Sequence, residues 1–87
     1  METAARHVLL IEDEANIAEA IRFVLVRDGW RVTTHRDGHD ALERVRQAGP
    51  DLVILDVMLP GQSGFDILAA LRSDPATAAL PVLVLTA

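Results

Sequence analysis

Short apolar runs alternate along the chain with segments of helical periodicity, and this alternation most constrains the fold. Residues 8–11 (VLLI) and 52–55 (LVIL) are continuous apolar runs of strand length, typical of strands buried on both faces. Elsewhere apolar residues recur at the three- and four-residue spacing of amphipathic helices. Strands that alternate with helices in this way predict an α/β fold, in which a parallel sheet is wound with right-handed crossovers.

Seven elements are expected, in the order β-α-β-α-β-α-β. The strands are predicted at residues 8–11, 30–34, 52–57 and 82–86, with 30–34 as a half-exposed edge strand. The three helices are expected to end near Gly29, Gly49 and Pro75, and Ser63 is expected to cap the third. Their inward apolar residues are Ile17, Ile21, Val24 and Leu25 in the first, Ala41, Leu42, Val45 and Ala48 in the second, and Ile67, Leu68 and Leu71 in the third.

Length and composition bound the class of protein. A chain of 87 residues, 51% of them hydrophobic, is expected to form one small globular domain. No apolar run is long enough to cross a membrane, and residues 1–7 are too short and polar for a signal peptide, so a cytoplasmic location is expected. Zero cysteines exclude disulfides and thiolate metal sites, and a net charge of −5 argues against direct binding of nucleic acid. All eight basic residues are arginines, so the lysine that a P-loop requires is missing.

Acidic residues follow two of the predicted central strands. Glu12 and Asp13 come after the first strand, Asp56 stands at the tip of the third, and Thr86 ends the fourth. In wound parallel sheets, ligands bind beyond the carboxyl ends of the strands, where the winding reverses. Crowded carboxylates without a nearby histidine or cysteine suit Mg²⁺, and a metal-bound aspartate is a plausible nucleophile toward a phosphoryl group. Gly61 would let the backbone bend closely around the incoming group, as would Gly64.

A simpler interpretation exists for each acidic residue alone. Glu12, Asp13 and Glu14 could merely cap the first helix, and Asp56 could cap a turn. The combination favours a site, because the acids terminate neighbouring strands at the predicted reversal of the winding.

Three segments resemble the receiver domain of bacterial two-component response regulators: "VLLIEDE", "LVILDVMLPGQSGFDIL" and "PVLVLTA". They occur in the family's order and spacing, and the resemblance covers the chain from Arg6 onward. It implies a CheY-like (flavodoxin-like) doubly wound sheet of strand order 2-1-3-4. It further implies that Asp56 accepts phosphate from a sensor histidine kinase. Mg²⁺ would be held by Glu12, Asp13, Asp56 and the backbone carbonyl of Met58, and Thr86 would be the switch hydroxyl.

The chain departs from the family pattern after Thr86. A receiver normally continues with a helix, a strand that carries a lysine, and a further helix, whereas this sequence ends at Ala87 and has no lysine. Residues 1–87 are therefore expected to form a single truncated receiver domain. Such a domain would be a phosphoacceptor and not an enzyme. The resemblance also implies an output domain of the DNA-binding kind, which is absent from this chain.

Two expectations follow from the missing elements. Mg²⁺ binding is expected to persist while stable phosphorylation and switching are impaired. The strand at 82–86 becomes an unprotected apolar edge, so a homodimer or higher oligomer through this edge is expected. The alternative function is a receiver fragment that does not signal and serves as a structural or oligomerisation module.

Overall fold

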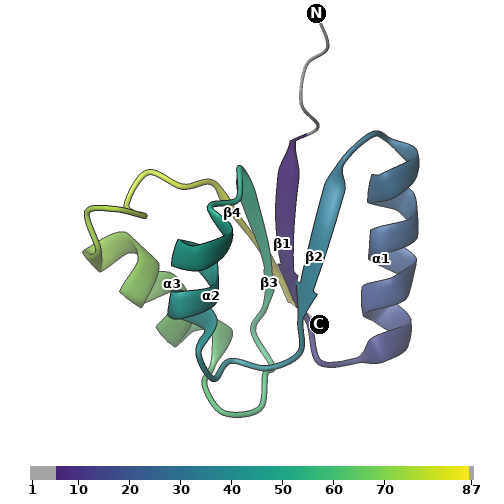
Figure 1. The fold of residues 1–87 in the computed structure, drawn as a ribbon. Helices are drawn as coiled ribbons and strands as arrows, with labels where there is room; N and C mark the ends of the chain where they lie inside the picture. Colours follow the sequence, from purple (N-terminus) through teal and green to yellow (C-terminus); the bar gives the residue numbers. More distant parts are fainter. Residues whose placement is uncertain (1–5, 87) are drawn as a thin grey trace, which may run out of the picture.

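The computed structural model describes residues 6–86 of the chain (Figure 1). The segment 1–5, on which the expectation about a signal peptide depends, and Ala87 lie outside the described residues. The predicted order of elements is confirmed: β1 (His7–Ile11), α1 (Ala15–Arg27), β2 (Arg31–His35), α2 (Ala41–Ala48), β3 (Leu52–Asp56), α3 (Gly64–Ser73) and β4 (Val82–Leu85).

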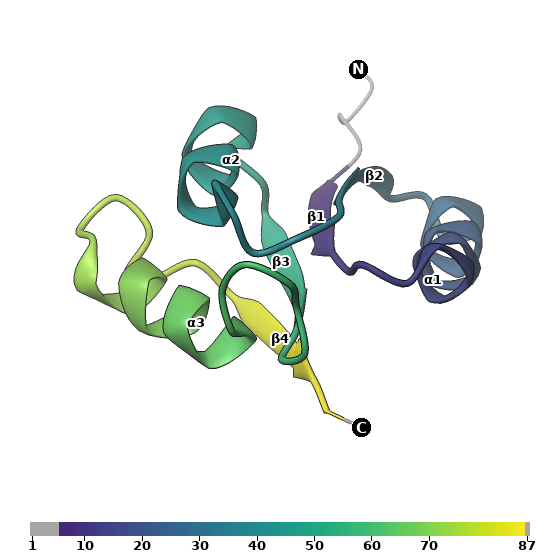
Figure 2. The same ribbon diagram turned by 90° about the horizontal axis from the view of Figure 1, so that it is seen from below.

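The four strands form one parallel sheet in the order β2-β1-β3-β4, as expected. Helix α1 covers one face of the sheet, and α2 and α3 cover the other (Figures 1 and 2). The winding therefore reverses between β1 and β3, the two central strands. The loops that follow β1, β2 and β3 all lie at the carboxyl edge of the sheet, which is the lower edge in Figure 1.

The core lies on both faces of the central strands. The cluster under α2 and α3 contains Leu9, Ile11, Ala41, Val45, Val53, Leu55, Ile67 and Leu71, and the cluster under α1 contains Val8, Leu10 and Ile54. Successive residues of β1 and β3 thus enter opposite clusters, because side chains alternate across a strand. This two-sided burial explains why the sequences of these strands are apolar without interruption.

The predicted inner face of α1 is only partly correct. Val24 is 63% exposed and Ile17 is 48% exposed, whereas Ala18, Ile21 and Leu25 pack against the sheet. The packed residues follow the i, i+3, i+7 spacing of a single narrow stripe. Helix α1, which lies wholly within the described residues, has no fully buried residue.

Strand β2 begins one residue later than predicted because Trp30 belongs to the end of the preceding helix. The Trp30 N–H donates to the carbonyl of Leu25 over 3.0 Å, and Gly29 adopts a φ of 96°. A hydrogen bond from residue i to residue i−5 across a glycine in the left-handed conformation is the Schellman motif, which ends many helices. It makes Trp30 part of the helix end, so β2 begins at the next residue. Strands β3 and β4 each end one residue earlier than predicted, at Asp56 and Leu85.

The ends of α2 and α3 are as predicted. Helix α2 stops at Gly49, whose φ is 55°, and α3 ends at Ser73, before Pro75. The Ser63 Oγ accepts hydrogen bonds from the Phe65 and Asp66 amides, over 3.1 and 3.5 Å, and so caps α3.

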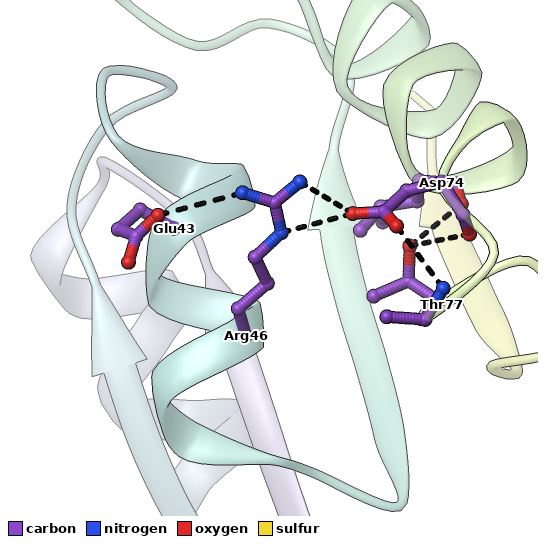
Figure 3. Close-up of polar contacts among 6 residues, drawn as sticks. Glu43, Arg46, Asp74 and Thr77 are labelled. Carbon is purple, nitrogen blue, oxygen red and sulfur yellow. Dashed lines mark hydrogen bonds and ion pairs between the residues drawn. The ribbon is translucent and has the colours of Figure 1, made fainter.

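An arginine on α2 ties this helix to the end of α3 (Figure 3). The Nε and Nη2 atoms of Arg46 both donate to Oδ2 of Asp74, over 2.9 and 2.6 Å. Its Nη1 lies 3.6 Å from Oε1 of Glu43. The hydroxyl of Thr77 donates to the carbonyl of Leu71 over 2.7 Å, which fixes the turn that follows α3.

Within residues 6–86, every helix is too short or too polar to cross a lipid bilayer.

Candidate acidic site at the carboxyl edge of the sheet

The register of β1 and β3 brings Glu12 next to Asp56. Ile11 lies opposite Leu55, so the residues that follow them emerge side by side at the carboxyl edge. Glu12, Asp13 and Asp56 each place one carboxylate oxygen so that these atoms lie within 4.8 Å of one another. The predicted convergence of acids from two neighbouring strand ends is confirmed.

Backbone hydrogen bonds hold the two strand-end acids in place. The Glu12 N–H donates to the carbonyl of His35 over 3.0 Å, which extends the pairing of β1 with β2. The Glu12 Oε2 accepts from the Glu14 amide over 3.0 Å, and Asp56 Oδ1 accepts from the Met58 amide over 3.1 Å. Nearby backbone amides therefore orient the carboxylates of Glu12 and Asp56.

The residue that caps α1 is an acid outside the cluster. Glu14 occupies the N-cap position, and its Oε1 accepts from the Asn16 amide over 3.0 Å. The interpretation that these acids only cap a helix or a turn is therefore right for Glu14. It is correct only in part for Glu12 and Asp56, which accept hydrogen bonds from nearby backbone amides and also face one another.

Glu12 is the buried member of the cluster, with 4% of its surface exposed. Burial raises the pKa of its carboxyl, the hydrogen bond from the Glu14 amide lowers it, and the nearby acids Asp56 and Asp13 raise it again. The net direction of the pKa is upward, so the cluster is an electrostatically unfavourable arrangement when no cation offsets its charge.

The donor set of this cluster fits a hard divalent cation. It consists of carboxylate oxygens, and within residues 6–86 neither imidazole nor thiolate belongs to it. Oxygen-only donors of this kind suit Mg²⁺, which takes one or two carboxylates and keeps several waters. The residues present therefore fit the ion that the sequence predicted.

Two further predicted site residues neighbour Asp56, Met58 along the chain and Thr86 through the pairing of β4 with β3. Met58 is 71% exposed, and the contact that the structure gives it is the bond from its amide to Asp56. Thr86 is exposed and follows Leu85, which lies opposite Asp56 in the register of β3 and β4. The metal-binding role of the Met58 carbonyl and the switch role of Thr86 stay predictions.

The glycines near the site let its loops pack closely, and their expected role around an incoming group stays a prediction. A Cβ on Gly64 would collide with the carbonyl of Asp56 and the Cα of Val57, and its amide donates to the Val57 carbonyl over 3.1 Å. Gly64 thus lets the start of α3 pack on the end of β3. Gly61 has a φ of 88° and approaches the backbone of His39. Both glycines serve the packing of loops around the site.

A groove between α1 and β2 continues from the cluster, and the sequence reasoning missed it. It encloses about 330 Å³, and its walls include Glu12, Asp13, Thr34, Arg22 and Arg36. Arg36 immediately follows β2, as Glu12 follows β1. Because both residues directly follow a strand, the sequence alone could have predicted that a basic residue lies at the same edge as the acids.

The chain resembles curated proteins that are about three times as long. It is 48% identical over 80 residues to the probable transcriptional regulatory protein TcrX of Mycobacterium tuberculosis, covering 92% of this chain and 33% of that protein. It is 40% identical over 87 residues to the DNA-binding response regulator MtrA of Mycobacterium bovis, covering 100% of this chain and 37% of that protein.

Solved structures share the fold. A putative response regulator from Chloroflexus aurantiacus superposes with a TM-score of 0.89 and 32% identity, covering 92% of this chain and 66% of that one. The phosphorylated cyanobacterial phytochrome response regulator RcpA superposes with a TM-score of 0.86 and 35% identity, covering 95% and 66%. The family model of the response regulator receiver domain matches residues 8–87. The chain therefore belongs to the response regulator receiver domain family, a family of regulatory domains.

Proposed function

We propose that Asp56 is the phosphoacceptor of this receiver domain and that a sensor histidine kinase is the donor. In the transfer, a carboxylate oxygen of Asp56 forms a bond to phosphorus. The bond between phosphorus and the histidine nitrogen of the kinase breaks, and the nitrogen keeps the electron pair. The observation that carries this proposal is the meeting of three carboxylates from two adjacent strand ends, with ligand atoms within 4.8 Å, in a chain of this family.

The proposal includes a Mg²⁺ site made by Glu12, Asp13, Asp56 and the backbone carbonyl of Met58. A bound divalent ion would offset charge on the transferring oxygens. Glu12 supports this assignment because its carboxyl is buried beside two other acids, where a cation lowers the cost of its charge. Asp13, which is exposed, would complete the set from the solvent side.

The wider role follows from the relatives. MtrA is described as a DNA-binding response regulator, and this chain spans about a third of its length. We infer that residues 1–87 act in the cytoplasm as a single receiver domain that reports to an output domain outside this sequence. Thr86, beside β3 at the same edge, is the proposed switch hydroxyl.

The test is phosphate uptake from a small phosphodonor such as acetyl phosphate, followed by intact-protein mass spectrometry. We expect slow uptake that requires Mg²⁺ and is lost in Asp56→Asn. The control is Asp51→Asn, which lies at the opposite end of β3. Equal uptake by Asp56→Asn, or uptake that persists after chelation, would refute the assignment. Slow uptake is expected because the 87-residue sequence holds no lysine to pair with the phosphate.

A second function, that of an assembly module, is favoured by one observation. Strand β4 pairs only with β3 among the described strands, and its Leu83 is 53% exposed. An apolar edge strand is a template for pairing with another chain. A chain that assembles but binds neither Mg²⁺ nor phosphate would be this module.

A further inference from the structure

Two loops meet beside the acidic cluster. The β2–α2 loop spans residues 36–40, and the β3–α3 loop spans residues 57–63. They lie side by side at the carboxyl edge of the sheet (Figures 1 and 2), where the Gly38 amide donates to the Pro60 carbonyl over 2.9 Å. The second loop contains Met58, whose backbone carbonyl is a proposed Mg²⁺ ligand. The path of this loop therefore decides where that ligand lies.

Glycines occupy both sides of the contact between the two loops. A Cβ on Gly38 would collide with the carbonyl oxygen and the amide nitrogen of Gln62. A Cβ on Gly61, whose φ is 88°, would come within 3.3 Å of the His39 amide nitrogen. Backbone packs directly on backbone here, because neither glycine has a side chain to separate the loops. A change in the path of one loop must therefore move the other.

Met58 lies between two fixed points of the β3–α3 loop. Its amide donates to Asp56 Oδ1 over 3.1 Å, and two residues later the Pro60 carbonyl accepts from Gly38. The Met58 side chain is 71% exposed, whereas Leu59 packs against the core. The position of the Met58 carbonyl thus depends on its neighbours in the chain, and the bond from Gly38 fixes the loop on the far side of Met58 from Asp56.

Two side chains hold the β2–α2 loop by one residue, His39. His35 Nε2 lies 2.9 Å from the His39 carbonyl oxygen, and Asp37 Oδ1 accepts from the His39 amide over 3.0 Å. Because a carbonyl oxygen can only accept, His35 Nε2 carries the proton and donates. Asp40 then leads into α2 with a φ of 62°, a left-handed conformation that few residues other than glycine adopt. Such a conformation persists where surrounding contacts impose the path of the chain.

His35 connects this loop to the end of the sheet. It is the last residue of β2, and its backbone carbonyl accepts from the Glu12 amide over 3.0 Å. Its side chain is only 16% exposed, so the imidazole is held by packing as well as by its hydrogen bond. The Nε2 donor of His35 therefore sets the β2–α2 loop relative to the strand ends that carry the acids.

We propose that His35 is a positioning residue for the Mg²⁺ site. Through the His39 carbonyl, it holds the β2–α2 loop against the β3–α3 loop and so places the Met58 carbonyl. This assignment rests on the proposed function, in which Met58 and Asp56 belong to the Mg²⁺ site. His35 touches neither the ion nor the phosphoryl group, and it acts through the backbone of the two loops.

The experiment compares His35→Ala, which removes the donor, with His39→Ala. The imidazole of His39 is 81% exposed and the contact uses only its backbone, so His39→Ala removes a histidine without removing a bond of the contact. His35→Gln is the conservative variant, because the amide group of glutamine keeps an N–H donor.

A second pair of variants changes the contact between the loops directly. Gly38→Ala forces the two loops apart at Gln62. Its control is Gly49→Ala at the other end of α2, where φ is 55° but a Cβ has open space. Both changes should lower the stability of the fold, and only Gly38→Ala should disturb the site.

Three measurements are made on each variant of the 87-residue chain. Backbone amide signals of residues 57–62 are recorded by NMR in a chelator, Mg²⁺ affinity is measured by calorimetry without a phosphodonor, and urea unfolding gives the stability. His35→Ala should move the amide signals of this loop in the metal-free protein and weaken Mg²⁺ binding about three- to tenfold. This loss is smaller than that for a group in direct contact with a metal ligand. His35→Gln should keep most of the affinity, and His39→Ala should match wild type.

The outcomes separate this assignment from the proposed function. If wild type binds Mg²⁺ and takes up phosphate, but His35→Ala keeps the loop signals or the Mg²⁺ affinity of His39→Ala, the role of His35 is overturned and that of Asp56 stands. Equal Mg²⁺ affinities in Gly38→Ala and Gly49→Ala would also overturn it. If Gly38→Ala does not fold, the His35 variants alone decide. If wild type binds no Mg²⁺, the proposed Mg²⁺ site fails, and the role of His35 fails with it.

Discussion

The carboxylates of Glu12 and Asp56 face one another at the ends of neighbouring strands, within a cluster whose ligand atoms lie no more than 4.8 Å apart. Glu12 is buried, and burial is the first cause of its raised pKa, followed among the raising effects by the charge of Asp56. A carboxyl group whose ionised form is less favourable in the folded state than in the unfolded state lowers the free energy of unfolding at any pH where it is ionised. This relationship therefore links metal binding to the stability of the fold.

Glu12→Gln should stabilise the metal-free protein at neutral pH. The folded-state pKa of Glu12 lies above its unfolded value, so its ionised form costs stability at neutral pH, and the cost disappears as the pH falls through the folded pKa. Urea unfolding in a chelator should show the variant as more stable than wild type at neutral pH, with the difference lost in acid.

Addition of Mg²⁺ should reverse that order. At ten times its dissociation constant, the ion stabilises the wild-type protein by about 1.4 kcal/mol, and the variant should gain less. Glu19→Gln, which changes an exposed acid on α1, should remain within about 0.5 kcal/mol of wild type throughout. A wild-type protein insensitive to Mg²⁺ would contradict the site.

Asp74→Asn should destabilise the protein at neutral pH and much less in strong acid. The N–H of Ala76 and then the guanidinium of Arg46 hold the pKa of Asp74 below its usual range (Figure 3). A depressed folded-state pKa contributes stability above the unfolded pKa, and this stability is lost as the pH falls through the folded pKa. Denaturant titrations at both pH values measure the difference, with Glu43→Gln as the control for the longer, 3.6 Å contact to Arg46. A pH-independent difference would argue against this account.

Ser63→Ala should lower the free energy of unfolding by about 1 kcal/mol, because it removes the cap of α3. Ser73→Ala is the matched control: its hydroxyl donates to the carbonyl of Ala69 on the exposed surface of the same helix, and the change should stay within about 0.5 kcal/mol. Chemical denaturation measures both variants. Equal losses would show that Ser63 does not act through the cap.

Leu71→Ala should cost about 2–5 kcal/mol, because the side chain is fully buried and leaves a cavity in the core. Val24→Ala on α1 should cost less than about 0.5 kcal/mol, since this valine is 63% exposed. Thermal unfolding distinguishes the two variants. A large loss for Val24→Ala would restore the original prediction that Val24 belongs to the inner face of α1.

Leu83→Lys should shift the protein toward the monomer if β4 pairs edge to edge with a second copy. A charged lysine on an edge strand opposes such pairing. Sedimentation velocity measures the change, and Val26→Lys, at a 46% exposed position on α1, is the control. A wild-type protein that is monomeric at all concentrations would remove the basis for the assembly function.

Much of the fold and site was predictable from local patterns. The apolar runs of β1 and β3, the left-handed glycine at the end of α2 and the cap at Ser63 are all local signals, and they were correct. The face of α1 was harder to predict, because Ile17 and Val24 satisfy the helical spacing as well as Ala18 does. Only the position of the helix over the sheet selects the stripe through Ala18, and a small residue there permits close approach.

The meeting of acids from two strands follows from the amino-acid sequence alone, because parallel strands direct their carboxyl ends to the same edge and a buried strand must end where its apolar run ends. The differences between those acids depend on how the elements pack together. Packing buried Glu12 and left Asp13 exposed, and the alignment of three strands set Arg36 in the row of Glu12 and Asp56. Register and burial arise from contacts between residues far apart in the chain, so no local pattern encodes them.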